Sequence, residues 1–338
     1  MAQQRNLSLD IIRTLACLMV ILMHSPKSDN TAGGIVLSSI SYLTAPCIGL
    51  FFMTSGALLL PIRESTAVFL RRRFSKIAVP TIIWSIFYLS INHVIENGEG
   101  NVFRAIASIL WGPQGTGVLW FMYALGGLYL LSPILSAWLR QSTPQEEKAY
   151  LSLWGITTCF PLLRLMVDVP EGVGNMLYSF SGYVGYFLLG HYLQHNKPKI
   201  PIWGISLLMG IPIGVVSAVK LSGTEIDFYQ YFWYLSVFVV AMTIAWFSLL
   251  SRIHWHKMLP YKIVQAIALF SKASFGIYLV HIFVMRKCLW NIEALNSLEG
   301  IAHIACVFLL TVGISWSFVV LISYLPHSEW LVGFHSKK

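Results

Sequence analysis

The first apolar segment of the chain reads Leu9-Asp10-Ile11-Ile12-Arg13-Thr14-Leu15-Ala16-Cys17-Leu18-Met19-Val20-Ile21-Leu22-Met23-His24. Its hydrophobicity is typical of a membrane-spanning helix, although Arg13 and His24 are ionisable. In an α-helix the steps from Arg13 to His24 turn through about 1100°, close to three full turns, and rise about 16 Å. Both side chains are therefore expected on one face, at two depths. Because ionisable groups in a span are costly and usually face a bundle interior or a cavity, we expect chemistry on this face.

The whole chain has the composition of a polytopic membrane protein. Of its 338 residues, 56% are hydrophobic and 11% are charged, and the mean hydropathy is +0.68. Soluble proteins carry about 25% charged residues. No small-residue cleavage site follows the first apolar run, so we expect it to remain as the first span. The five cysteines are scattered through apolar stretches, which predicts packed thiols and neither a disulfide framework nor a bound metal.

Hydropathy windows of about 20 residues predict an all-α, single-domain bundle over residues 1–338. The ten expected spans lie near residues 7–25, 40–60, 77–95, 116–137, 149–167, 176–195, 200–220, 229–250, 270–290 and 301–325. Ten spans leave both termini on one side, and the loops on that side hold most of the Lys and Arg residues. The positive-inside rule then places both termini in the cytoplasm. The net charge of +9 follows from these loops, and no nucleic-acid partner is needed to explain it.

The ionisable residues of the first segment allow two interpretations. His24 is either a structural histidine hydrogen-bonded at the outer end of a span, or a catalytic group. A catalytic histidine would act as a general base on a hydroxyl or accept an acyl group as a nucleophile. Asp10 lies one turn before Arg13, and its expected role is to pair with that guanidinium.

A basic cluster, Arg71, Arg72, Arg73 and Lys76, precedes the third expected span. Such cations next to a membrane commonly determine topology or contact lipid headgroups. The functional alternative is a phosphate clamp. Arg73 and Lys76 are three residues apart on the helix that is expected to begin there, so they share a face and can grip a polyphosphate.

Two further segments combine small or aromatic residues with a span. Ser55 and Gly56 follow two phenylalanines, a pattern typical of close helix contact, although it can also make room for a narrow ligand tunnel. Trp120 and Tyr123 lie near the start of the fourth expected span, where aromatic residues usually form the interfacial belt.

The ninth expected span contains Ser274-Phe275-Gly276-Ile277-Tyr278-Leu279-Val280-His281. His281 is expected about midway through this span, and a histidine at the midplane is a functional candidate. Arg164, near the outer end of the fifth expected span, is expected to extend to the interface.

Together these segments resemble the acyltransferase-3 family of integral-membrane O-acyltransferases. The motifs that carry the resemblance are Leu9-Asp10-(x)2-Arg13-(x)10-His24, Phe52-(x)2-Ser55-Gly56, Arg73-(x)2-Lys76 ahead of Pro80, Leu119-Trp120-Phe121 with Tyr129 and Pro133, and Gly276-Ile277-Tyr278-(x)2-His281. One departure concerns Lys76, because the family often has a second arginine there. A lysine keeps the charge but loses the planar bidentate grip on phosphate.

The resemblance implies an enzyme of a bacterial inner membrane that moves an acyl group, most commonly acetyl, from cytoplasmic acyl-CoA to a hydroxyl of a surface or lipid-linked glycan. The catalytic residues would be His24, Arg13 and Asp10. The donor-binding residues would be Arg71, Arg72, Arg73, Lys76, Ser55 and Gly56, and the acceptor-binding residues Trp120, Tyr123, Tyr278 and His281. The phosphates of coenzyme A favour the basic cluster, its thin arm would pass Arg13, and His24 would meet the thioester.

Within this mechanism we favour general-base attack by the sugar hydroxyl over a transient acyl-imidazole. A transporter of a small molecule or glycan is the alternative class, since intramembrane His and Arg also mark permeation paths. Transporters commonly show paired repeats, and this sequence shows no convincing repeat. A membrane sensor or scaffold gives no reason for aligned ionisable groups.

Overall fold

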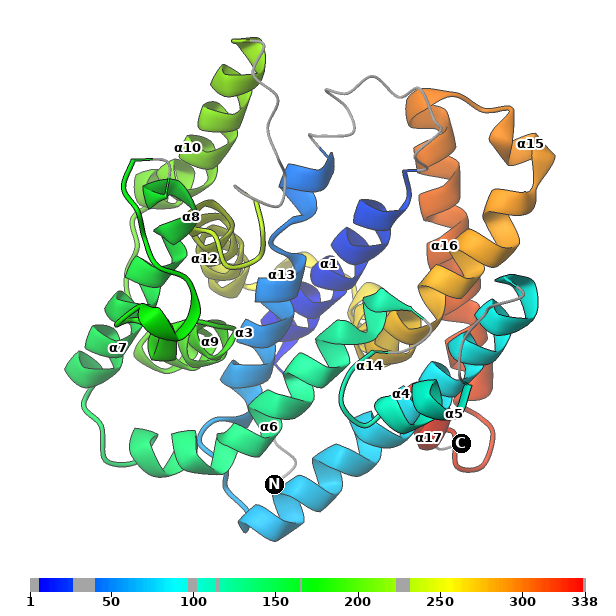
Figure 1. Ribbon diagram of the computed structural model, residues 1–338, viewed down its shortest axis with the longest axis horizontal. Helices are drawn as coiled ribbons and strands as arrows, with labels where there is room; N and C mark the ends of the chain where they lie inside the picture. Colours follow the sequence, from blue (N-terminus) through cyan, green and yellow to red (C-terminus); the bar gives the residue numbers. More distant parts are fainter. Residues whose placement is uncertain are drawn as a thin grey trace. The chain divides into compact units, whose positions relative to one another are not determined.

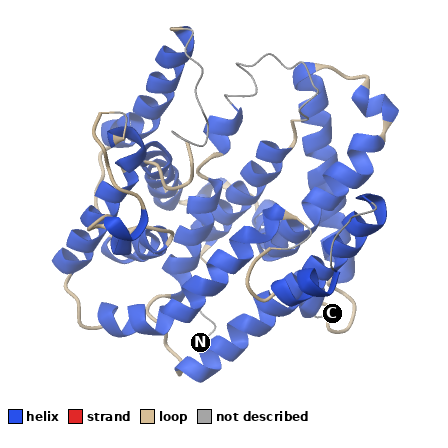
Figure 2. Cartoon of the chain, in the orientation of Figure 1, coloured by secondary structure: helices blue, strands red, loops and turns tan. Residues whose placement is uncertain are grey.

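The computed structural model describes residues 6–26, 40–96, 102–113, 116–164, 166–222 and 232–336. Within these ranges the secondary structure is helical and no strand occurs (Figure 2), so the all-α prediction is confirmed there. The longer helices, most of them labelled in Figure 1, are α1 (Leu7–His24), α3 (Cys47–Leu59), α4 (Thr66–Glu96), α6 (Trp120–Leu139), α7 (Pro144–Thr158), α9 (Val184–Asn196), α10 (Ile202–Leu221), α12 (Val237–Arg252), α14 (Tyr261–Ile282) and α16 (Gly300–Ile322). The shorter ones are α5 (Val102–Ser108), α8 (Phe160–Leu163), α13 (Trp255–Met258), α15 (Glu293–Asn296) and α17 (Glu329–Val332).

Within the described ranges, seven helical segments are long and apolar enough to cross a membrane, judged by length and composition. They are Leu7–His24, Ile40–Leu59, Thr66–Asn92, Gly117–Leu139, Ile202–Val219, Tyr261–Asn291 and Gly300–Ile322. Each overlaps one of the ten expected spans. A multi-pass membrane protein is therefore supported, with fewer long spans than the hydropathy windows predicted.

The other three expected spans overlap in part with the shorter helices α7, α9 and α12, of 15, 13 and 16 residues. A bilayer needs about 20 residues of helix. Residues 229–231 of the eighth expected span lie outside the described residues. The count of ten and the cytoplasmic placement of both termini, which depends on that count, are not confirmed. A hydropathy window averages across helix ends, and α7 ends at Thr158, shortly before Pro161.

Two spans begin earlier than the windows predicted. α4 begins at Thr66, 11 residues before the expected start at residue 77, so the whole basic cluster lies within this helix. The window excluded these turns because their charges lower the average hydropathy. α14 begins at Tyr261, nine residues before the expected start.

The chain divides into two compact units, each built from segments that are far apart in the sequence. Unit 1 comprises Met1–Pro61, Leu135–Ser271 and Glu299–Ile301, and unit 2 comprises Ile62–Ile134, Lys272–Leu298 and Ala302–Lys338. The single domain over residues 1–338 stays a prediction.

In unit 1, α3 packs against α1, α9 and α12. The contact between α3 and α9 is close enough to require glycine. A Cβ atom on Gly56 would lie 1.8 Å from the carbonyl oxygen of Phe187, and one on Gly190 would lie 2.0 Å from that of Met53. Small residues that let backbones approach are a common way to join membrane helices.

In unit 2, α4 contacts two other elements through buried aromatic residues. Trp84 donates from Nε1 to the carbonyl oxygen of Leu331 in α17 at 2.9 Å. The hydroxyl of Tyr88 donates to the carbonyl oxygen of Leu279 at 2.8 Å and accepts from the amide of Phe283 at 3.2 Å. Phe283 begins a six-residue π-helix, Phe283–Cys288, which follows α14 directly.

Candidate functional site

Helix α1 presents the predicted ionisable residues on a single unbroken element. Asn6 caps its N-terminus by accepting hydrogen bonds from the amides of Ser8 and Leu9, which satisfies two donors that the first turn leaves without a helical partner. The helix then continues without interruption to His24. Arg13 and His24 therefore lie on one face, about three turns apart, as the spacing predicted. Both residues are half-buried.

Asp10 is buried in unit 1, where its Oδ1 atom accepts a hydrogen bond from the Oγ atom of Ser271 at 2.7 Å. Ser271 was not among the predicted site residues. The signal in the sequence is weak, because it amounts to a polar residue inside an apolar span. This bond fixes the first turn of α1 to α14, while the pairing of Asp10 with Arg13 stays a prediction.

The other end of α1 is held by an aromatic residue. The hydroxyl of Tyr234 donates to the sulfur of Met23 at 3.5 Å, and the carbonyl oxygen of Tyr234 accepts from the hydroxyl of Tyr186 at 2.6 Å. Met23 also packs against a buried cluster that includes Tyr42 and Phe232. The turn that carries His24 is thus ordered by its neighbours in unit 1.

Ser55 and Gly56 lie on α3, and both are buried. The contact of Gly56 with the backbone of α9 confirms the interpretation of this pair as a close helix contact. Their assignment to a donor tunnel stays a prediction.

The basic cluster lies on the first turns of α4 in unit 2. Arg71, Arg72 and Lys76 are exposed, and Arg72 lies 3.7 Å from a carboxylate oxygen of Glu64. Arg73 is half-buried, with its guanidinium 5.7 Å from the centre of the Phe69 ring.

One atom of this cluster is unusual. The Nε atom of Arg73 is buried and has no hydrogen-bond partner among the described residues. A buried donor without a partner is costly, by about 1–3 kcal/mol. An anion that accepted a hydrogen bond from it would remove this cost. The exposed cations beside it would favour the same anion electrostatically.

Three of the four predicted acceptor residues belong to one aromatic group in unit 2. The ring of Phe121 lies 6.3 Å from that of Trp120 and 5.3 Å from that of Tyr278, and Tyr278 lies 5.5 Å from His281. The Tyr278 hydroxyl donates to the carbonyl oxygen of Val118.

The fourth residue, Tyr123, bonds elsewhere, because its hydroxyl donates to the carbonyl oxygen of Ile109 at 2.6 Å. His281 is completely buried, and its Nδ1 atom lies 2.7 Å from the carbonyl oxygen of Tyr278. It is the last residue but one of α14. It lies past the middle of the span Tyr261–Asn291, and not midway as predicted, because this span begins earlier.

Among the described residues, no three His, Cys, Asp or Glu side chains are grouped so that they could hold a metal ion.

These features define a multi-pass helical membrane protein with ionisable groups on its spanning helices. A family model described as an acyltransferase domain, Acyl_transf_3, matches residues 6–320. The chain belongs to the acyltransferase-3 family, and this membership supports an acyltransferase activity in the membrane. No curated protein and no solved structure matched the chain.

Proposed function

We propose that this protein is a membrane O-acetyltransferase that moves an acetyl group from acetyl-CoA to a hydroxyl of a surface or lipid-linked glycan. The observation that carries the proposal is the unbroken helix Leu7–His24 with Arg13 and His24 on one face, in a chain that matches the acyltransferase model over residues 6–320. The proposed location is the inner membrane of a bacterium, where membrane lipids surround the chain.

His24 is the proposed general base. Its imidazole takes the proton from the sugar hydroxyl as the oxygen forms a bond to the thioester carbon. The carbon–sulfur bond then breaks, and the imidazolium returns the proton to the leaving thiolate. The half-buried position of His24 suits this role, because the ring is supported by neighbours and still accessible to a substrate. A transient acyl-imidazole is the alternative route.

Arg73 and Lys76, with Arg71 and Arg72, are proposed to hold the phosphates of the donor. The buried Nε atom of Arg73 supports this assignment, since it requires an acceptor. Arg72 is partly engaged by Glu64, so we expect Arg73 and Lys76 to contribute more. Coenzyme A supplies the activated acyl group, and the protein supplies position and charge.

The acceptor is proposed to be a carbohydrate that contacts Trp120, which is half-buried. Tyr278 and His281, both buried, and Tyr123 would support this contact as packed side chains. Three short segments also support a glycan acceptor. The segments Ala16–Val20, Phe51–Met53 and Ser132–Pro133 resemble the enzyme that O-acetylates enterobacterial common antigen. This likeness rests on those residues alone, and it makes a bacterial surface glycan the first acceptor to test.

The experiment is a turnover assay with purified full-length protein and acetyl-CoA labelled in the acetyl group. Without acceptor we expect slow hydrolysis of the thioester. When a cell-envelope glycan fraction is added, acetyl-CoA should be consumed faster and the label should appear in the glycan. Absence of both reactions in folded protein would reject the acyltransferase proposal and favour a transporter, which uptake into vesicles would then reveal.

A further inference from the structure

Unit 1 contains a pocket that none of the predicted site residues line. Its volume is about 330 Å³, and its walls come from residues 157–182 and Leu235. Most of these residues belong to the connection between α7 and α9. The hydropathy windows interpreted this connection as the end of one span, a short loop and the start of the next span. Pockets that bind small ligands usually measure about 300–1,000 Å³, so this one has room for a compact ligand.

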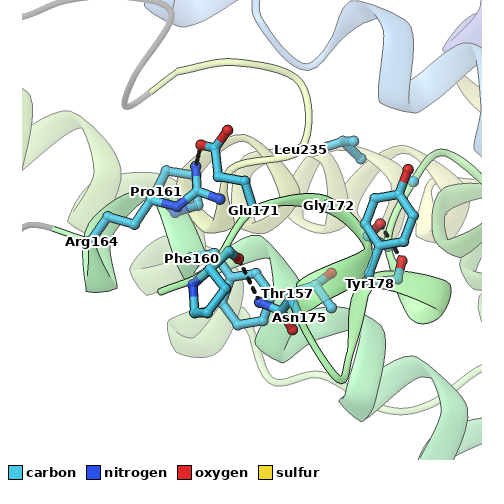
Figure 3. Close-up of a pocket in the computed structure, with 12 residues that line it drawn as sticks. Thr157, Phe160, Pro161, Arg164, Glu171, Gly172, Asn175, Tyr178 and Leu235 are labelled. Carbon is cyan, nitrogen blue, oxygen red and sulfur yellow. Dashed lines mark hydrogen bonds and ion pairs between the residues drawn. The ribbon is translucent and has the colours of Figure 1, made fainter. Parts of the chain in front are cut away.

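The pocket combines an ion pair with aromatic rings. Figure 3 shows Arg164 and Glu171 joined at one end and the ring of Tyr178 at the other, with Phe160 between them along the wall. Arg164 was expected to extend to the membrane interface. It lies beyond the end of α7, where it pairs with Glu171.

This combination is suited to a sugar ring. Planar carboxylate and guanidinium groups can each hydrogen-bond two adjacent hydroxyls, because they offer paired acceptors or paired donors. Aromatic rings pack against the C–H face of a pyranose. The Arg164–Glu171 pair is more than a third exposed on both sides, and such pairs contribute only about 0–1 kcal/mol. A hydroxyl-rich ligand can therefore bind between the two groups at little cost.

Hydrogen bonds hold the walls of the pocket in place. The side chain of Asn175 donates to the carbonyl oxygen of Pro170 at 3.2 Å and accepts from the amide of Leu177 at 2.8 Å. Trp154 donates from its indole nitrogen to the carbonyl oxygen of Gly182 at 2.9 Å. A site whose walls are already fixed loses less conformational entropy when it binds a ligand.

The pocket lies at the His24 end of α1 within unit 1. Leu235, which lines the pocket, follows Tyr234 in the chain, and the Tyr234 hydroxyl bonds to the sulfur of Met23. Met23 precedes His24. The Asp10 end of the same helix is bonded instead to Ser271, about three turns away along α1.

We propose that this pocket binds a sugar residue of the acceptor glycan, other than the residue that receives the acetyl group. The inference rests on the proposed function, because it names a second contact for the same acceptor. The pocket would hold the glycan by a neighbouring ring, and this contact would favour acceptors with a particular sugar at that position.

The test measures sugar binding directly and does not depend on turnover. Full-length protein in lipid nanodiscs is examined by saturation-transfer difference NMR with the methyl glycosides of glucose, N-acetylglucosamine and glucuronic acid. We expect signals from at least one of these sugars. Tyr178→Ala should weaken binding roughly three- to tenfold, the scale of one aromatic contact, and Arg164→Gln should also weaken it. Tyr178→Phe, which keeps the ring, should bind more tightly than Tyr178→Ala.

Matched controls come from the same connection. Val173 and Met176 are almost fully exposed and do not line the pocket, so Val173→Ala and Met176→Ala should bind sugar like the unmodified protein. Octyl glycosides of the same sugars distinguish the two sources of the ligand. If an octyl glycoside gives a stronger signal than the methyl glycoside, and Tyr178→Ala abolishes that signal, the pocket is assigned to a lipid-linked glycan. If the octyl and methyl glycosides give equal signals, the pocket is assigned to a polysaccharide.

The pocket proposal is overturned if none of the three sugars gives a signal, or if folded Tyr178→Ala and Arg164→Gln bind like the unmodified protein. Donor hydrolysis is measured on the same unmodified sample. Hydrolysis without sugar binding would reject the pocket alone. Sugar binding without any donor turnover would reject the proposed acyl transfer and leave a sugar-binding site.

Discussion

Helices α1 and α14 each carry a candidate histidine near their C-terminal end, but they hold it in different ways. α1 is a regular α-helix up to His24, and the histidine is half-buried. α14 is regular only as far as Ile282, one residue beyond His281, which is completely buried. The first histidine is partly exposed, whereas the second is part of a packed core.

The irregularity after α14 occurs where a side chain of α4 contacts the chain. In an α-helix the amide of Phe283 would donate to the carbonyl oxygen of Leu279. Here the Tyr88 hydroxyl bonds to both groups, and the chain continues as the π-helix Phe283–Cys288. A side chain inserted into the hydrogen-bond ladder is a known source of such distortion. The register of α1 follows from local spacing, whereas we expect the π-helix after α14 to depend on Tyr88 of α4.

The largest expected effect tests whether His24, at the end of α1, is catalytic. His24→Ala should lower the rate of acetyl transfer by roughly 100-fold or more, the usual contribution of a general base. The melting temperature should change little, because the side chain is only half-buried. Leu22→Ala, two residues earlier on the same helix, is the matched control and should keep most of the activity. Normal turnover by His24→Ala would show that His24 is not catalytic.

The second prediction concerns the buried histidine of α14. His281→Ala should lower the free energy of unfolding by about 1–3 kcal/mol, because it removes a packed, hydrogen-bonded side chain. Thermal melting in detergent measures this loss. His256→Ala, at an exposed histidine, should leave the melting temperature unchanged. If His281→Ala melts at the same temperature as the unmodified protein, burial of His281 does not stabilise the fold, and the contrast with His24 is wrong.

The sequence predicted features that depend on neighbours along one helix, but not contacts between distant residues. The register of Arg13 and His24 depends on neighbours along one helix, and spacing was sufficient to predict it. The insertion of Tyr88 and the bond from Ser271 to Asp10 join residues far apart in the chain, and hydropathy carries no information about such contacts. The expected span over residues 149–167 is not confirmed as one helix, since α7 ends at Thr158 and α8 follows it.

The third prediction concerns α4, which carries both Tyr88 and the basic cluster. Changing Arg73 and Lys76 together to Gln should raise the donor KM by roughly tenfold and weaken its dependence on salt, because charge-assisted contacts to phosphate are lost. Arg71 and Arg72 remain in place to preserve the orientation of the helix in the membrane.

A truncated donor provides the control for this variant. Acetyl-pantetheine lacks the nucleotide phosphates, so its KM should be nearly the same in the variant and in the unmodified protein. Equal losses with acetyl-CoA and acetyl-pantetheine would assign the cluster to folding or to lipid contact.

The smallest expected effect tests the cause of the irregularity in α14. Tyr88→Phe removes only the hydroxyl, after which the amide of Phe283 and the carbonyl oxygen of Leu279 can bond directly. We expect the free energy of unfolding to fall by about 1 kcal/mol, the net value of a hydrogen bond, as measured by thermal melting. Tyr261→Phe, at the first residue of α14 and 74% exposed, should change the free energy of unfolding by less than about 0.5 kcal/mol. Hydrogen exchange at the Phe283 amide should change in Tyr88→Phe alone. Unchanged stability together with unchanged exchange would mean that the π-helix does not depend on Tyr88, and that both helices are shaped by their own sequence.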